Sequence, residues 1–169
     1  LCYSRGRGGL PRRGQRTSAM RVAVGADHAG YELKQRLVAW LRTQGHDVED
    51  LGTDSTAPVD YPDYAEAVSR AVLEARADRG LVVCGSGVGA AIAANKLPGI
   101  RAGLCHDTYS AERARKSNDA QVITMGARVI GSELAKAIIE TWLNAEFAGG
   151  RSAPKVEKMN AVDEKYRHQ

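Results

Sequence analysis

The chain has few of the features that mark membrane, secreted or metal-binding proteins. Its longest purely apolar runs span only a few residues, which predicts no transmembrane helix and no membrane partner. It holds three cysteines, an odd number without the spacing of a disulfide framework, so we expect free thiols and a reducing compartment such as the cytoplasm. Its four histidines are scattered and form no metal signature, so neither a metal nor another cofactor is predicted.

Acidic residues are absent from the first 19 positions, although the whole chain has 20 of them. The same segment contains five of the 24 lysines and arginines, which leaves 19 basic and 20 acidic residues in positions 20–169. A basic fold that binds nucleic acid is therefore disfavoured. Glycines and a proline interrupt any amphipathic helix in residues 1–19, so this segment is predicted to be a disordered extension. We interpret it as upstream read-through ahead of a natural start at Met20, with one domain over residues 20–169.

Hydrophobic residues make up 43% of the 169 residues, enough for one domain with its own core. From Met20 onward, short β-branched runs alternate with segments of helical periodicity. Strands are predicted at residues 21–26, 47–51, 81–84, 101–105 and 121–125. Helices are predicted at residues 31–44, 63–76, 90–96, 109–116, 133–145 and 153–166, with Ser132 as the cap of the fifth. This alternation predicts an α/β fold: a three-layer α/β/α sandwich around a five-stranded parallel sheet.

Ligands of such folds bind where the carboxyl ends of the parallel strands meet the following helices. The loop after the first predicted strand places Asp27 beside His28. Asp27 can cap the next helix, but a cap does not require an imidazole, so His28 favours a binding role. The loop after the fourth strand contains His106, followed by a candidate helix cap at Asp107 or Thr108. His106 is at least as compatible with an ordinary capped turn as with an active site.

The loop after the third predicted strand, residues 85–89, has glycine at alternate positions. Its backbone N–H groups can converge on an anion, and the following helix adds its positive end. The loop lacks the lysine of a Walker motif, the spacing of a dinucleotide fingerprint and the arginine of a cysteine phosphatase. Cys84 directly precedes it, where loop amides and the helix end would stabilise a thiolate. The alternative for Cys84 is a small buried hydrophobe, and this interpretation is favoured for Cys105.

Among the cations beyond the fifth predicted strand, three are candidate phosphate ligands, namely Arg128, Arg151 and Lys155. Scattered cations are usually only solvated side chains. Beside an anion-binding loop, however, they can hold a phosphate. Spacing alone leaves both interpretations open.

Six short segments occur in the order found in one protein family. They are Gly25-Ala26-Asp27-His28-Ala29-Gly30, Asp60-Tyr61-Pro62, Cys84-Gly85-Ser86-Gly87-Val88-Gly89, Ala93-Ala94-Asn95-Lys96, Ser117-Asn118-Asp119 and Gly149-Gly150-Arg151. From Met20 onward the chain therefore resembles the type B ribose-5-phosphate isomerases, whose family also holds the galactose-6-phosphate isomerase subunits. The resemblance implies a Rossmann-like sandwich and a homodimer or dimer of dimers with active sites shared between subunits. It also implies interconversion of aldose and ketose phosphates without a metal.

The resemblance assigns a role to each matching residue. Cys84 would be the general base that interconverts ribose 5-phosphate and ribulose 5-phosphate, a step of the non-oxidative pentose phosphate pathway, with Ser86 as a hydroxyl ligand. The anion hole for the enediolate would come from Gly85, Gly87, Val88 and Gly89. Asp27 and His28 would contact sugar hydroxyls and the phosphate end, Asn118 would be a hydroxyl ligand, and Tyr61 would line the site. Phosphate contacts would come from Arg128, Arg151 and Lys155. A thiolate beside preorganised amides suits this reaction, which needs a base and donors aimed at an oxyanion.

Two positions depart from the family pattern. Ser117 stands where many members have the histidine assigned to opening the sugar ring, so His106 is our hypothesis for that catalytic role. Lys155 replaces an arginine, so a point charge takes the place of a bidentate fork. The alternative substrates are a tetrose phosphate, which does not close into a ring, allose 6-phosphate and galactose 6-phosphate. Two further classes are a non-catalytic sugar-phosphate-binding module, disfavoured by the intact base and anion hole, and a dinucleotide oxidoreductase, disfavoured by the loop position.

Overall fold

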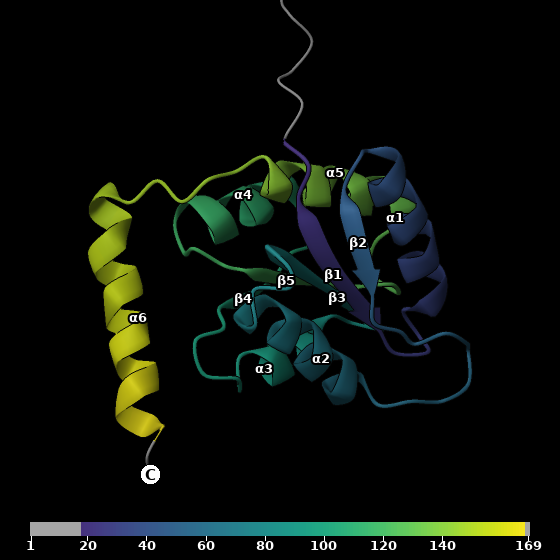
Figure 1. Cartoon of the computed structure of the whole chain (residues 1–169), viewed down its shortest axis with the longest axis horizontal. Helices are drawn as coiled ribbons and strands as arrows, with labels where there is room; N and C mark the ends of the chain where they lie inside the picture. The colour runs from purple at the N-terminus through teal and green to yellow at the C-terminus, as the bar shows by residue number, and fades with distance from the viewer. Residues whose placement is uncertain (1–17, 168–169) are drawn as a thin grey trace, which may run out of the picture.

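The computed structural model describes residues 18–167. The extension predicted for residues 1–19 lies almost wholly outside this range and stays a prediction. Five parallel strands form one sheet in the order β2-β1-β3-β5-β4, and helices cover both of its faces (Figure 1). The predicted α/β sandwich with a five-stranded parallel sheet is confirmed.

The three central strands are the most apolar. The strands are β1 (Arg21–Ala26), β2 (Asp47–Asp50), β3 (Arg79–Cys84), β4 (Ala102–Leu104) and β5 (Val122–Gly126). Every residue of β3 and β5 is buried, as are all but the first of β1. Strands covered on both faces need apolar residues at every position, which explains the continuous hydrophobic runs in the sequence. The edge strands β2 and β4 are short, which limits their unpaired backbone.

Two layers of helices pack against the sheet. The helices are α1 (Tyr31–Thr43), α2 (Tyr61–Leu73), α3 (Val88–Ala94), α4 (Thr108–Lys116), α5 (Ser132–Leu143), the 3-10 helix η1 (Gly150–Ser152) and α6 (Ala153–Tyr166). Figure 1 shows α1, α4 and α5 on one face and α2 and α3 on the other. The core of the first face includes Leu37, Ile138 and Trp142, all fully buried. Helix α6 stands to one side, on the β4 side of the sheet, and buries only Val156.

Helices α2 and α3 each begin two residues before the predicted start, at Tyr61 and Val88. Helix α2 can begin early because Pro62 in its first turn needs no hydrogen-bonded N–H there. The prediction that Ser132 caps α5 is wrong: Gly131 is the cap residue, and no side chain makes a capping bond. The predicted cap Asp107 is confirmed, since its carboxylate accepts the Ser110 N–H at 2.6 Å.

The topology places the ligand-binding edge between β1 and β3. From β1 the chain first pairs with β2 on one side and then crosses to β3 on the other, so the switch point of the sheet lies between these strands. Their carboxyl ends are joined directly, since the Asp27 N–H donates to the Val83 carbonyl at 3.3 Å. Across residues 18–167, no helix combines the length and apolar character needed to cross a bilayer.

Candidate active site

A cavity of about 660 Å³ opens at the carboxyl ends of β1 and β3, a size typical of small-molecule sites. Most of the residues predicted for the site line it: Asp27, His28, Tyr61, Cys84, Gly85, Ser86, Val88, Gly89 and Arg128. Sequence reasoning missed three apolar lining residues, Ala29, Ile92 and Val129. Ile92 follows Val88 by four residues and so shares its face of α3, a signal that was available in the sequence.

Cys84 ends β3 and is 3% exposed. The chain reverses sharply after it, with Gly87 in the left-handed region at φ +78°. This turn aims the Gly87 N–H at the sulfur, to which it donates at 3.0 Å. The Thr124 hydroxyl holds the turn from β5 by donating to the Gly87 carbonyl at 2.9 Å. The loop thus solvates the sulfur with a fixed amide, and a thiolate gains more from such a bond than a thiol does.

Cys105 has a different environment. It is 1% exposed and belongs to the core under α4 and α5. Burial, and secondarily the charge of Asp107, raise the pKa of its thiol to about 12. This environment fits the predicted role as a small buried hydrophobe. Both cysteines in the described range are free; the third, Cys2, lies outside it.

Asp27 and His28 have complementary roles at the end of β1. Asp27 is 6% exposed, and its carboxylate accepts the Gly30 N–H at 3.0 Å, so it shapes the turn into α1 while lining the cavity. Nδ1 of His28 lies 3.1 Å from both the N–H and the carbonyl oxygen of Val59, so it accepts from one or donates to the other according to the tautomer. In either tautomer Val59 engages Nδ1, which leaves Nε2 to contact a ligand.

The glycine loop is bordered by a hydroxyl, a phenol and a cation. Ser86 Oγ accepts the Val88 N–H at 3.2 Å and keeps its own proton to donate. A side chain at Gly89 would lie 2.4 Å from the ring of Tyr61, so only glycine allows this approach. A Cβ at Gly85 would lie 3.5 Å from Nη1 of Arg128, which places the guanidinium beside the loop amides. A cation and converging amides form an anion-binding site.

Four other predicted side chains lie outside the cavity lining. Asn118, Arg151 and Lys155 are all exposed. His106 is half-buried, and its Nε2 accepts the Gly126 N–H at 2.9 Å, which leaves that nitrogen without a proton to give while the bond lasts. The fifth residue not in the lining, Gly87, lies beneath it and acts through the bond to Cys84. Among residues 18–167, no group of three or more His, Cys, Asp or Glu side chains is placed to hold a metal.

The fold and the cavity together define a class: a doubly wound α/β protein whose cavity places a thiol beside a glycine loop and a cation suited to an anion. The family described as Ribose/Galactose Isomerase matches residues 22–159, and the chain belongs to this family of sugar-phosphate isomerases. Similar proteins include a D-erythrulose-4-phosphate isomerase of Pectobacterium atrosepticum, 52% identical over 88% of this chain and 98% of that protein. A ribose-5-P isomerase B of Listeria innocua is 50% identical over 88% of this chain and 100% of that protein.

Solved structures of similar proteins have the same fold as this chain. The ribose-5-phosphate isomerase B of Clostridium thermocellum superimposes with a TM-score of 0.86 at 46% identity, covering 87% of this chain and 99% of that one. The Leishmania infantum type B ribose 5-phosphate isomerase gives 0.84 at 42% identity, covering 88% and 99%. The Rossmann-like fold expected from the resemblance is therefore confirmed.

Proposed function

We propose that this chain interconverts ribose 5-phosphate and ribulose 5-phosphate, with Cys84 as the base. The observation that carries the proposal is the position of Cys84: it lines the cavity and accepts an amide N–H at 3.0 Å. The names of several relatives support the substrate. A reducing cytoplasmic location fits the free thiols and stays part of the proposal.

The reaction moves one hydrogen between neighbouring carbons. The Cys84 thiolate removes the proton from C2 of the open-chain aldose, which leaves an enediolate with its negative charge on O1. The same sulfur then returns the proton to C1, while the proton of the O2 hydroxyl moves to O1 and C2 becomes the carbonyl carbon. Loop amides and the Ser86 hydroxyl stabilise the oxyanion. Removing one such donor typically costs about 3 kcal/mol of transition-state stabilisation.

A direct test replaces the sulfur. We expect Cys84→Ala to abolish isomerisation and the exchange of the C2 hydrogen with D₂O, while ribose 5-phosphate still binds. Cys105→Ala is the control, because it removes a buried thiol of the same protein that lies outside the cavity lining. Turnover by Cys84→Ala that is comparable to wild type would rule out Cys84 as the base.

We further propose that the active site is completed by a second copy of the chain. Asn118, Arg151 and Lys155 are exposed and lie outside the cavity of their own chain. The cavity is bordered by exposed apolar side chains, with Val88 47% and Ile92 56% exposed. A symmetric dimer would cover these apolar side chains and bring each chain's cations to the partner's cavity. Dimers that pair further are equally compatible with this arrangement.

Subunit mixing tests the sharing of sites. Cys84→Ala and Arg151→Ala are each expected to be inactive alone. In a mixed dimer with shared sites, one site contains both intact residues, so random reassociation restores about a quarter of wild-type activity. Failure of the mixture to regain activity, with mixed dimers demonstrated by native mass spectrometry, would show that Arg151 acts in its own chain.

A four-carbon substrate is the second candidate, and Ser117 favours it. The serine hydroxyl cannot act as the ring-opening acid of the family histidine, and Nε2 of His106 already accepts the Gly126 N–H. A tetrose phosphate needs no ring opening, and the Pectobacterium relative carries such a substrate in its name. A turnover panel of ribose, allose, galactose and erythrose phosphates decides between the candidates.

Two variants sharpen this panel. If His106 opens the ring, His106→Asn slows ribose 5-phosphate much more than erythrose 4-phosphate; equal slowing removes that role. Ser117→His restores the family residue and is expected to raise kcat/KM for ribose 5-phosphate selectively. An unchanged ratio of the two substrates would mean that position 117 does not set the preference.

A further inference from the structure

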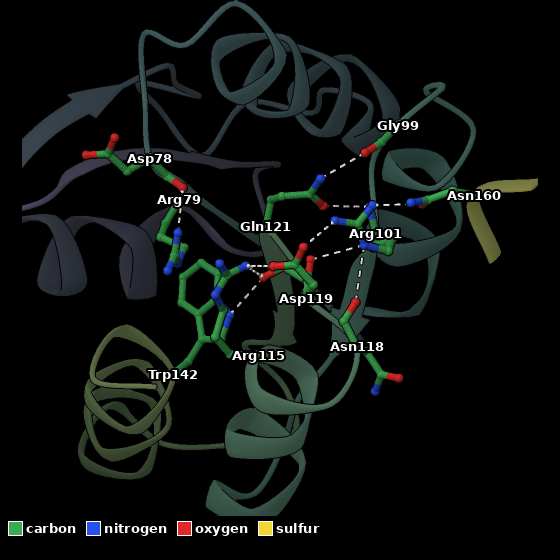
Figure 2. A network of polar contacts seen from close by, with 11 residues as sticks. Asp78, Arg79, Gly99, Arg101, Arg115, Asn118, Asp119, Gln121, Trp142 and Asn160 are labelled. Carbon is green, nitrogen blue, oxygen red and sulfur yellow. Dashed lines mark hydrogen bonds and ion pairs between the residues drawn. The ribbon is translucent and has the colours of Figure 1, made fainter. Parts of the chain in front are cut away.

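Arg101 links three segments that are distant in the sequence (Figure 2). Its Nε donates to the carbonyl oxygens of Asn118 at 3.2 Å and Asp119 at 3.1 Å, and its Nη2 donates to the Asp119 carboxylate at 3.0 Å. Its Nη1 donates to the side-chain oxygen of Asn160 in α6 at 3.0 Å. The Arg101 side chain is only 18% exposed, so solvent screens these bonds less than it does at an open surface.

The turn that carries Asn118 depends on these bonds. Asp119 has φ +49°, a left-handed conformation that is uncommon for residues other than glycine. Arg115 holds the same carboxylate from the other side at 2.7 Å. Two guanidinium groups therefore fix the turn, while the Asn118 side chain stays exposed with only a 3.5 Å contact to the Arg113 carbonyl.

Helix α6 docks on the segment that contains Arg101. It buries only Val156, so apolar packing contributes little to its position. Its polar contacts are made by Asn160, which binds Arg101, and by Asp163, whose carboxylate accepts the Gly99 N–H at 2.8 Å. Lys155 lies five residues before Asn160 on this helix, about 7.5 Å along the axis. The position of Lys155 relative to Asn118 thus depends on Arg101.

We propose that Arg101 is a positioning residue that sets the spacing between a sugar ligand, Asn118, and a phosphate ligand, Lys155. This inference rests on the proposed function, which assigns those two ligands. One guanidinium touches both the Asn118 turn and α6, so its loss frees each to move relative to the other.

A double-mutant cycle tests whether Arg101 acts through Asn118. We expect Arg101→Gln to raise KM for the sugar phosphate about tenfold or more with a smaller change in kcat, because Asn118 and Lys155 are proposed to bind the substrate and not to move its proton. In an Asn118→Ala background, Arg101→Gln should raise KM by at most about a third of that factor. Equal losses in both backgrounds, or no loss from Arg101→Gln, would overturn the proposal and indicate a purely structural residue.

Arg21→Gln is the matched control. Arg21 also makes a guanidinium network, with bonds to Asp78 and to the Ala75 carbonyl, but on β1, which β3 and β5 separate from β4 in the sheet. Arg21→Gln should leave KM unchanged. An equal rise in KM would show that any lost guanidinium network has this effect.

Two further measurements cover other outcomes. If Arg101→Gln does not fold, Asn160→Ala offers a milder test, because it removes only the bond from Arg101 to α6. It should raise the inhibition constant of inorganic phosphate several-fold, whereas Glu157→Ala on the same helix should not. Equal inhibition constants for these two variants would overturn the proposal. Binding of ribose 5-phosphate in the Cys84→Ala background gives a readout that does not need turnover. A weaker affinity there on adding Arg101→Gln supports positioning even if Cys84 is not the base, and an unchanged affinity contradicts it.

Discussion

Substituting Gly87 by alanine tests how the glycine loop holds its sulfur contact. Gly87 has φ +78°, a conformation that costs an L-residue about 1–2 kcal/mol. Its new Cβ would also lie 2.6 Å from Leu104 Cδ1 and 2.8 Å from the Met125 carbonyl carbon. The leucine tip can rotate away, but the β5 backbone must shift, which adds about 1–3 kcal/mol. We therefore expect Gly87→Ala to lower the free energy of unfolding by about 2–5 kcal/mol.

Gly45→Ala is a matched control. Gly45 also has a positive φ, +89°, but a Cβ there meets nothing within 4 Å, so only the conformational cost of about 1–2 kcal/mol applies. Both variants are compared with wild type by urea denaturation at one protein concentration, because association shifts apparent stability. Gly87→Ala should also lower kcat at least tenfold, since its N–H contacts Cys84. Equal destabilisation by the two variants, or unchanged kcat in Gly87→Ala, would refute this reasoning.

Three further predictions concern buried or half-buried groups. Partial burial lowers the pKa of His46 from 6.5, and its Nδ1 accepts the Met20 N–H. The neutral ring therefore stabilises the fold above pH 6.5, and this contribution is lost as pH falls below 6.5 and through the lower pKa of the folded state. His46→Gln should make the unfolding free energy depend less on pH between pH 7 and 5, and an unchanged slope contradicts this. The Lys34 side chain is 1% exposed and pairs with Asp50 at 2.6 Å. Lys34→Met should lower the free energy of unfolding in urea by about 1–3 kcal/mol, which is less than the loss from breaking a fully buried pair, because Asp50 reaches solvent. A stabilised variant would show that the cost of desolvating Lys34 exceeds the gain from the ion pair. Because burial raises the pKa of Cys105 to about 12, iodoacetamide at pH 8 should leave its peptide unmodified by mass spectrometry for as long as the protein stays folded, and rapid labelling would contradict this.

The sequence carried enough information to predict the layers and the cavity loops. Strands buried on both faces and helices with one apolar face give different periodicities, so the alternation of β1 through α5 could be predicted with small errors at the ends. The parallel topology then brings the loops after β1 and β3 to one edge, which is why Asp27 and Cys84 could be predicted to meet. Their joint place in the cavity lining agrees with this expectation; their chemical roles stay predictions.

Contacts between residues far apart in the sequence could not be predicted in this way. Arg101 and Asn160 are 59 positions apart, and no periodicity relates a strand-edge arginine to a helix surface. The bond between His106 and Gly126 likewise depends on the spacing of two neighbouring loops. Val129 has no such sequence signal as the helical spacing of Ile92 from Val88, so only the folded chain identifies it as a lining residue.

The proposed functional residues fall into a central group and a peripheral group. Cys84 and Asp27 are anchored in the rigid centre of the sheet, whereas the proposed ligands Asn118 and Lys155 sit on an outer turn and an outlying helix. On the proposed roles, substitutions at the periphery would change which sugar is accepted and would leave the surroundings of Cys84 intact. This division is compatible with relatives that bear five-carbon and four-carbon substrates in their names while each shares about half of its residues with this chain.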